Sequence, residues 1–172
     1  MTTLQQPALL EEAPPARQVA QLNRALKQGR SSDWIMERLN GIAPRHALTE
    51  ALKQAVEYVD PAGNKSSFLD KKLGKGQTPE GQFIEAETSY IYGKLGISRT
   101  ARKALKHGSK RDQLDAAQLH AVGLAEQHDA RIWEKCVKDR WPREKAKQAR
   151  TKMLNRLASV QQFMQELTGA RT

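Results

Sequence analysis

The sequence predicts an all-α protein: a multi-helix domain with a helix-turn-helix-like unit and a long C-terminal helical hairpin or extension. Three observations support this fold class. Apolar residues recur three and four positions apart through most of the 172 residues, which is the spacing of one helix face. Residues that cap helices stand where these stretches begin and end. No stretch alternates apolar and polar residues as a half-buried strand does.

The N-terminal part of the chain is predicted to contain a lead-in and three helices. Residues 1–13 are expected to be disordered. Residues 14–60 are expected to form an N-terminal helical unit. Its first helix is closed by Gly29, and its second is capped by Ser31 or Ser32.

A segment rich in Gly, Lys and Ser separates this unit from the rest of the chain. It covers residues 61–78, follows the end of the third helix at Asp60, and is predicted to be a loop or linker, either a hinge or a packed loop. Residues 79–172 are then expected to form a basic helical unit. Its first helix is capped by the Thr78 hydroxyl and has Pro79 at its first position.

Two further helices are predicted in the C-terminal third. Asp115 and Gln118 form a capping box at the start of a helix that is expected to run to Trp141. Pro142 either kinks this helix or opens a new one. An apolar seam then follows over residues 146–167 and must be buried, either against the preceding helix or against the same helix of a second chain. The acids of the first helix are expected on a solvated or ion-paired face: Glu126, Asp129, Glu134 and Asp139.

The positive charge of the chain is concentrated in two blocks. The formal net charge is +10, yet acids and bases balance over residues 1–93. Residues 94–111 contribute +7 and residues 140–172 contribute +6, while residues 112–139 between them contribute −3. Clustered Lys and Arg favour a polyanionic partner, because phosphate contacts release condensed counterions.

The first basic block has the pattern of a helix-turn-helix. Gly96 is expected to close one helix, Ser98 to cap the next, and Gly108 to close that second helix. In such a unit the second helix enters the major groove of DNA. The side chains predicted to read bases or hold phosphate are Arg99, Thr100, Arg102, Lys103, Lys106, Lys110 and Arg111.

The second basic block lies on the helix after Pro142 and is predicted to contact the DNA backbone. The residues expected to do so are Arg143, Lys145, Lys147, Arg150 and Lys152. DNA-reading helices commonly work as symmetric pairs. We therefore expect a homodimer through residues 146–167.

Several other classes of protein are disfavoured. Cys136 is the only cysteine, so it forms neither an intramolecular disulfide nor a CxxC metal site, and a reducing cytoplasm is expected. No apolar run approaches the length of a membrane helix, and we expect no secretory leader. No HExxH, P-loop or GxSxG pattern occurs. We expect no enzyme activity, no catalytic or metal-binding residues, and no cofactor.

The segment YGKLGISRTARKAL resembles the helix-turn-helix segments of bacterial transcription regulators. The likeness covers about twenty residues and centres on Leu95, Gly96, Ile97 and Ser98. The segment LDAAQLHAVGLAE is more distantly similar to the C-terminal helices of phage-encoded regulators of the antirepressor kind. These resemblances imply a regulator that binds duplex DNA.

The sequence therefore predicts a DNA-binding regulatory protein of a phage, plasmid or other mobile element. Two alternatives stay open at this point. The basic surface could serve a protein-interaction module, such as an inhibitor or antirepressor that binds an acidic protein partner. It could also bind RNA, although aromatic residues make up only 5% of the chain and offer few platforms for stacked bases.

Overall fold

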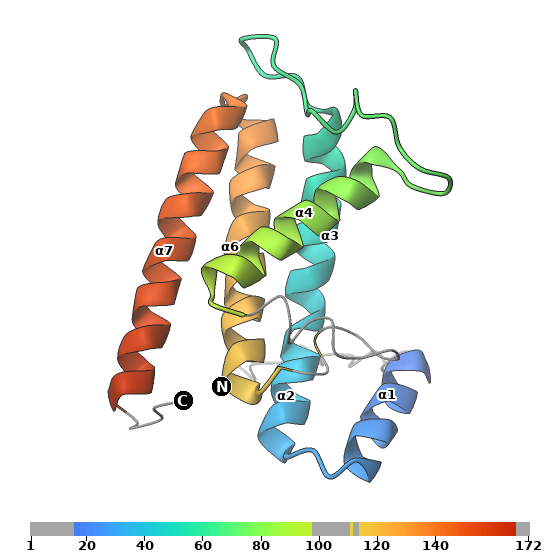
Figure 1. The fold of residues 1–172 in the computed structure, drawn as a ribbon, viewed down its shortest axis with the longest axis vertical. Helices are drawn as coiled ribbons and strands as arrows, with labels where there is room; N and C mark the ends of the chain where they lie inside the picture. The colour runs from blue at the N-terminus through green and yellow to red at the C-terminus, as the bar shows by residue number, and fades with distance from the viewer. Residues whose placement is uncertain (1–15, 98–110, 112–113, 168–172) are drawn as a thin grey trace, which may run out of the picture.

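The computed structural model describes residues 16–97, 111 and 114–167, which are helical with connecting turns and contain no strand (Figure 1). This confirms the predicted all-α fold. The helices are α1 (Ala16–Lys27), α2 (Ser32–Asn40), α3 (Ile42–Glu57), α4 (Pro79–Lys94), α6 (Ala116–Lys138) and α7 (Arg143–Leu167). In this part of the chain, no helix combines the length and the apolar character needed to cross a membrane.

Helix α6 lies at the centre of the molecule. It packs against α2, α3, α4 and α7, and α4 crosses in front of α3 and α6 in Figure 1. Its Leu119, Val122 and Trp133 are buried in one hydrophobic cluster with Leu52 of α3 and Leu154 of α7. The core therefore runs through both of the units that the sequence predicted on either side of residues 61–78.

The predicted caps define the helix starts. The Ser31 hydroxyl accepts a hydrogen bond from the Trp34 amide, and Thr78 does the same for Gly81. The capping box of Asp115 and Gln118 is present at the start of α6. These interactions satisfy amides that have no partner within the helix, so they mark where a helix can begin.

Pro142 opens a new helix and does not kink a longer one. Helix α6 ends at Lys138, three residues before Trp141, and α7 begins directly after Pro142. Arg140 has a φ of 52°, and the Trp141 amide donates to the Cys136 carbonyl at 2.9 Å. This is the Schellman arrangement, with an arginine at the position that glycine usually occupies.

The first part of the 61–78 segment is packed against the helices. The Asp60 carboxylate accepts hydrogen bonds from the amides of Ala62 and Asn64, and from that of Arg143 at the start of α7. Ser66 is buried, and the Phe68 ring lies 5.5 Å from that of Phe83 in α4. These contacts attach the segment to α4 and α7.

The apolar seam of α7 is divided along its length. Ala146 and Leu154 are buried in the core and Leu157 is half-buried, so this part packs within the chain. Val160 and Phe163 are 60% and 58% exposed. The first half of the seam is therefore buried within the same chain, which is one of the two predicted arrangements.

Candidate functional site

Helix α4 ends in a turn that is closed by a left-handed glycine. Gly96 has a φ of 71°, the Ile97 amide donates to the Tyr92 carbonyl at 2.9 Å, and the Gly96 amide donates to the Gly93 carbonyl at 3.2 Å. These two bonds form a Schellman cap, and the buried Tyr92 and Ile97 occupy the positions of its usual hydrophobic contact. The predicted closure of this helix by glycine is confirmed.

Most of the predicted DNA-reading side chains lie outside the described residues. These are Arg99, Thr100, Arg102, Lys103, Lys106 and Lys110. The predicted caps Ser98 and Gly108 lie outside them too. The described residues on either side are Ile97 and Arg111, both of which are buried.

Arg111 does not lie on a surface where it can hold phosphate. It is 7% exposed, its Nη2 pairs with Glu126 Oε2, and its Nη1 donates to the Gly41 carbonyl at 2.8 Å. Burial alone would lower the pKa of Arg111, but Glu126 outweighs burial and raises it. The prediction that Arg111 binds DNA is corrected on this geometry, because the guanidinium is engaged inside the protein.

Glu126 is the centre of this buried charge cluster. Its other oxygen, Oε1, lies 3.3 Å from Nη1 of Arg45, which also donates to Thr88 at 2.6 Å. One turn further along α6, Asp129 is fully buried, and neither of its oxygens accepts a hydrogen bond within the described residues. Burial, with a smaller effect of Glu126, raises the pKa of Asp129 to about 8. Glu126 is therefore ion-paired, which is one of the two predicted alternatives, whereas Asp129 is neither solvated nor ion-paired among the described residues.

Arg150 is also directed inward. It is 8% exposed, pairs with the buried Glu87 of α4, and its guanidinium carbon lies 4.2 Å from the centre of the Tyr90 ring. Burial lowers the pKa of Arg150 to about 10. This arginine links α7 to α4 instead of facing a ligand at the surface, and its predicted DNA contact is corrected.

Arg143 is the third predicted DNA contact that the fold buries. Its Nη1 donates to the carbonyls of Ala55 and Tyr58 at 2.6 and 2.8 Å, at the C-terminal end of α3. Its backbone amide donates to Asp60. Burial alone would raise the pKa of Asp60, but the hydrogen bonds it accepts lower it to about 2. Arg143 therefore holds the end of α3, where a positive charge is favourable, and its predicted role is corrected.

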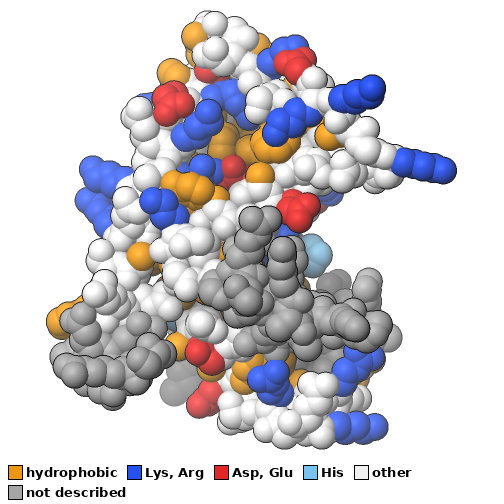
Figure 2. Space-filling view, in the orientation of Figure 1, with side chains coloured by type: hydrophobic (Ala, Val, Ile, Leu, Met, Phe, Trp, Pro, Cys, Tyr) orange, Lys and Arg blue, Asp and Glu red, His pale blue; other side chains and the backbone are white. Residues whose placement is uncertain are grey.

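Three of the predicted α7 contacts remain exposed. They are Lys145, Lys147 and Lys152. Lys145 Nζ lies 4.1 Å from the centre of the Trp141 ring, and Lys147 Nζ lies 3.5 Å from Glu144. Figure 2 shows Lys and Arg side chains gathered along the side of the molecule where α7 lies.

The fold brings the start of the first basic block to the middle of α7. Lys94 Nζ donates to Asn155 Oδ1 at 3.1 Å, and one turn earlier the Tyr90 hydroxyl lies 2.8 Å from that of Thr151. Lys152 and Arg156 are exposed on the same part of α7. The two basic blocks, about sixty residues apart at these contacts, meet in space here.

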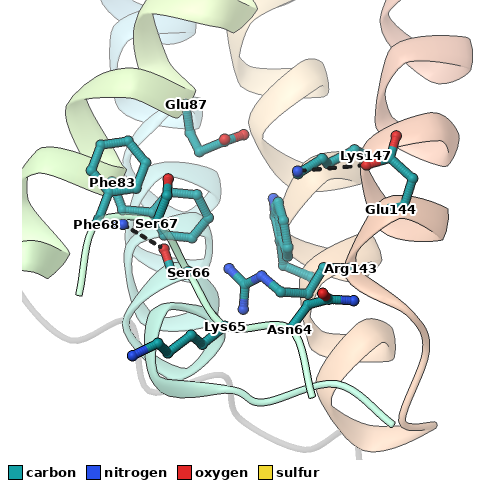
Figure 3. A pocket seen from close by; sticks show the side chains of 11 residues that line it. Asn64, Lys65, Ser66, Ser67, Phe68, Phe83, Glu87, Arg143, Glu144 and Lys147 are labelled. Carbon is teal, nitrogen blue, oxygen red and sulfur yellow. Dashed lines mark hydrogen bonds and ion pairs between the residues drawn. The ribbon is translucent and has the colours of Figure 1, made fainter. Parts of the chain in front are cut away.

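A cavity of about 390 Å³ lies between the 61–78 segment, α4, α6 and α7 (Figure 3). Phe68, Phe83 and Trp133 supply aromatic walls, and Arg143 and Lys147 supply cations. Sequence reasoning missed this cavity because its walls come from segments far apart in the chain.

The buried acids could have been found from the sequence by their register. Glu126 and Asp129 lie three residues apart and in line with Val122 and Trp133 on the apolar face of α6. Carboxylates on such a face require partners or protonation, because an unpaired buried charge is costly. Glu87 on α4 follows the same logic, although nothing local identifies Arg150 as its partner.

No protein-family model, curated protein or solved structure matches this chain.

Proposed function

We propose that this chain is a DNA-binding regulatory protein of a phage, plasmid or other mobile element. It binds duplex DNA through the basic segment that follows α4 and through the exposed lysines of α7. The observation that carries the proposal is the contact between Lys94 and Asn155, because it places the start of one basic block against the other.

This proximity supports a single electrostatic surface. Lys152 and Arg156 flank Asn155 on α7, and Lys94 is the first residue of the block that contributes +7. Phosphates along a duplex repeat every few ångströms, so neighbouring cations from two segments can contact one stretch of backbone together. The Schellman cap at Gly96 supports a sharp change of direction where the second helix of the motif is expected.

The burial of three arginines narrows the proposed contact set. Arg111, Arg143 and Arg150 support the core, and the contacts to duplex DNA come from Lys145, Lys147 and Lys152 together with Arg99, Thr100, Arg102, Lys103, Lys106 and Lys110. The two groups differ in role. The first segment reads bases, and α7 holds the phosphate backbone.

Substitutions in the two groups test the proposal through gel-shift titrations over a salt series. Arg102→Ala is expected to cost about 1–3 kcal/mol at the preferred site and to flatten the sequence preference. Lys152→Gln is expected to weaken all duplexes alike and to lower the salt slope by about one unit. Lys53→Gln, which changes an exposed lysine of α3, is the matched control and leaves both unchanged.

Charge reversal of Lys145 and Lys152 together with Arg99 and Arg102 separates the classes of partner. Loss of duplex binding with an unchanged melting temperature supports the proposal. Retained duplex affinity would overturn it, and a simultaneous loss of an acidic protein partner would assign the basic surface to an inhibitor or antirepressor. Tighter binding of single-stranded or hairpin RNA than of duplex DNA would assign the surface to RNA.

A further inference from the structure

The cavity beside α7 contains a buried arginine, Arg143, that forms no ion pair among the described residues. Arg143 is 6% exposed, and its Nη1 donates to two backbone carbonyls. Among the described residues, no carboxylate forms an ion pair with it. The nearby Asp60 binds the backbone amide of Arg143 instead of its side chain. A buried cation of this kind favours the binding of an anion, because the protein interior screens charges weakly.

A second group in the same wall lacks a partner. Trp133 lines the cavity, is 1% exposed, and its indole N–H has no acceptor within the part of the chain that the structure describes. Buried tryptophan N–H groups usually find a hydrogen-bond partner. Trp34 illustrates the usual case, since its indole N–H donates to the Leu114 carbonyl at 2.7 Å.

Both acids that line the cavity form ion pairs. Glu87 pairs with Arg150, and Glu144 pairs with Lys147. Of the lining cations, Lys65 pairs with Asp70 and Lys147 with Glu144, whereas Arg143 forms no ion pair among the described residues. Figure 3 shows Arg143 and Lys147 from α7 and Glu87 from α4 around the same space. The lining charge that the described residues leave without an ion pair is therefore that of Arg143.

The remaining walls suit a flat, apolar group. The Phe83 ring lies 5.3 Å from Trp133 in an edge-to-face arrangement and 5.5 Å from Phe68. Aromatic surfaces combined with a few convergent polar groups are typical of small-molecule sites, and volumes of roughly 300–1,000 Å³ are usual for them. The cavity volume of about 390 Å³ lies within that range.

We propose that this cavity binds a small aromatic anion, with its ring against Phe68, Phe83 and Trp133 and its carboxylate or phosphate beside Arg143 and Lys147. The Trp133 N–H donates to an acceptor atom of the ligand. The inference does not depend on the proposed DNA binding, although Lys147 belongs both to the cavity lining and to the surface proposed for DNA. Because α7 contributes to both, a bound ligand is placed to affect the helix that carries the exposed lysines.

The test uses the full chain with benzoate, phenyl phosphate and inorganic phosphate as probes. The chain has three tryptophans, so its ¹H–¹⁵N spectrum contains three indole signals, and Trp133→Phe identifies the one from Trp133. At least one aromatic probe is expected to shift that signal saturably while the Trp34 signal stays in place. The response to phenyl phosphate compared with that to benzoate tells which anionic group the site prefers.

Lys147→Gln and Lys145→Gln form a matched pair on the same helix. Lys147 lines the cavity, while Lys145 lies against Trp141 outside it. Lys147→Gln is expected to weaken the aromatic probe about tenfold, as loss of one charge-assisted contact does, and Lys145→Gln to leave its affinity unchanged. Thermal unfolding of both variants shows whether the fold is intact.

Three outcomes would overturn the proposal. One is the absence of any Trp133 shift with all three probes at millimolar concentration. Another is an equal loss of affinity in the two lysine variants, since that would place the anion on the surface of α7. The third is equal affinity for inorganic phosphate and phenyl phosphate, which would remove the aromatic ring from the recognition.

Discussion

At the scale of single residues, the molecule is organised by buried ionic pairs. Glu126 is paired with Arg111 and Arg45, and Glu87 with Arg150. Removing one member of such a pair leaves a charge without compensation, which is strongly destabilising. Arg111 and Arg150 are therefore buried because they pair with acids that are buried on α6 and α4. Such arginines support the fold, whereas basic residues at the surface can contact a partner.

Asp129 differs from these acids because it is buried and has no hydrogen-bond or ion-pair partner among the described residues. Its pKa of about 8 lies above the value of 3.8 in an unfolded chain, so the folded state binds an extra proton between these two pH values. The free energy of unfolding contributed by this group therefore falls as the pH rises from about 4 to 8. Below pH 4 the carboxyl is protonated in both the folded and the unfolded state, so its ionisation no longer changes the free energy of unfolding.

Asp129→Asn is expected to remove this pH dependence. The variant should be more stable than the wild type by about 1–3 kcal/mol at pH 8, and the difference should shrink toward pH 4.5. Urea unfolding of both proteins between these pH values measures it. Glu134→Gln, at an exposed position of α6, should give no such trend. A constant difference across the range would show that Asp129 is ionised in the fold at acidic pH.

At the scale of elements, the residues at the helix ends determine where each helix begins and stops. Helix starts follow side-chain caps at Ser31, Thr78 and Asp115, and α4 ends at a left-handed glycine. The end of α6 uses the same left-handed conformation at Arg140. For a residue with a β-carbon this conformation costs about 1 kcal/mol relative to glycine.

Arg140→Gly is therefore expected to stabilise the turn between α6 and α7. The gain in the free energy of unfolding should be about 1 kcal/mol, measured by chemical denaturation. Arg140→Ala removes the same charge but keeps the β-carbon, so it should produce no gain. If alanine stabilises as much as glycine, the effect comes from removing a positive charge and not from backbone conformation.

At the scale of the whole molecule, α6 is the axis on which the other helices pack, and α7 extends beyond this packing. The first half of the α7 seam is buried in the chain, whereas Val160 and Phe163 remain exposed. Val160 belongs to the heptad seam and Phe163 lies beside it, and exposed apolar groups at such positions favour association with another helix. We expect the predicted homodimer to form through this distal part of residues 146–167.

Light scattering over a concentration series tests the dimer. The wild type is expected to show twice the mass of one chain at high concentration. Val160→Glu combined with Phe163→Glu should yield a monomer, because charges would be buried between the two helices. Gln148→Glu adds charge at an exposed position of the packed half of α7 and should leave the dimer intact. A wild-type mass of one chain at every concentration would contradict the prediction.

The sequence by itself determined the fold class, the caps and the closure of α4 at Gly96, because these depend on hydrogen bonds and apolar spacing within a few residues. It also indicated a basic face on α7, where Lys145, Lys147 and Lys152 are exposed. Only the tertiary structure decided that Arg111, Arg143 and Arg150 are buried. Their partners lie 15 to 88 residues away in the chain, on helices that meet only in the folded core. A count of charges along a helix cannot distinguish an arginine at the surface from one that neutralises a buried acid, because that depends on which distant residue packs opposite it.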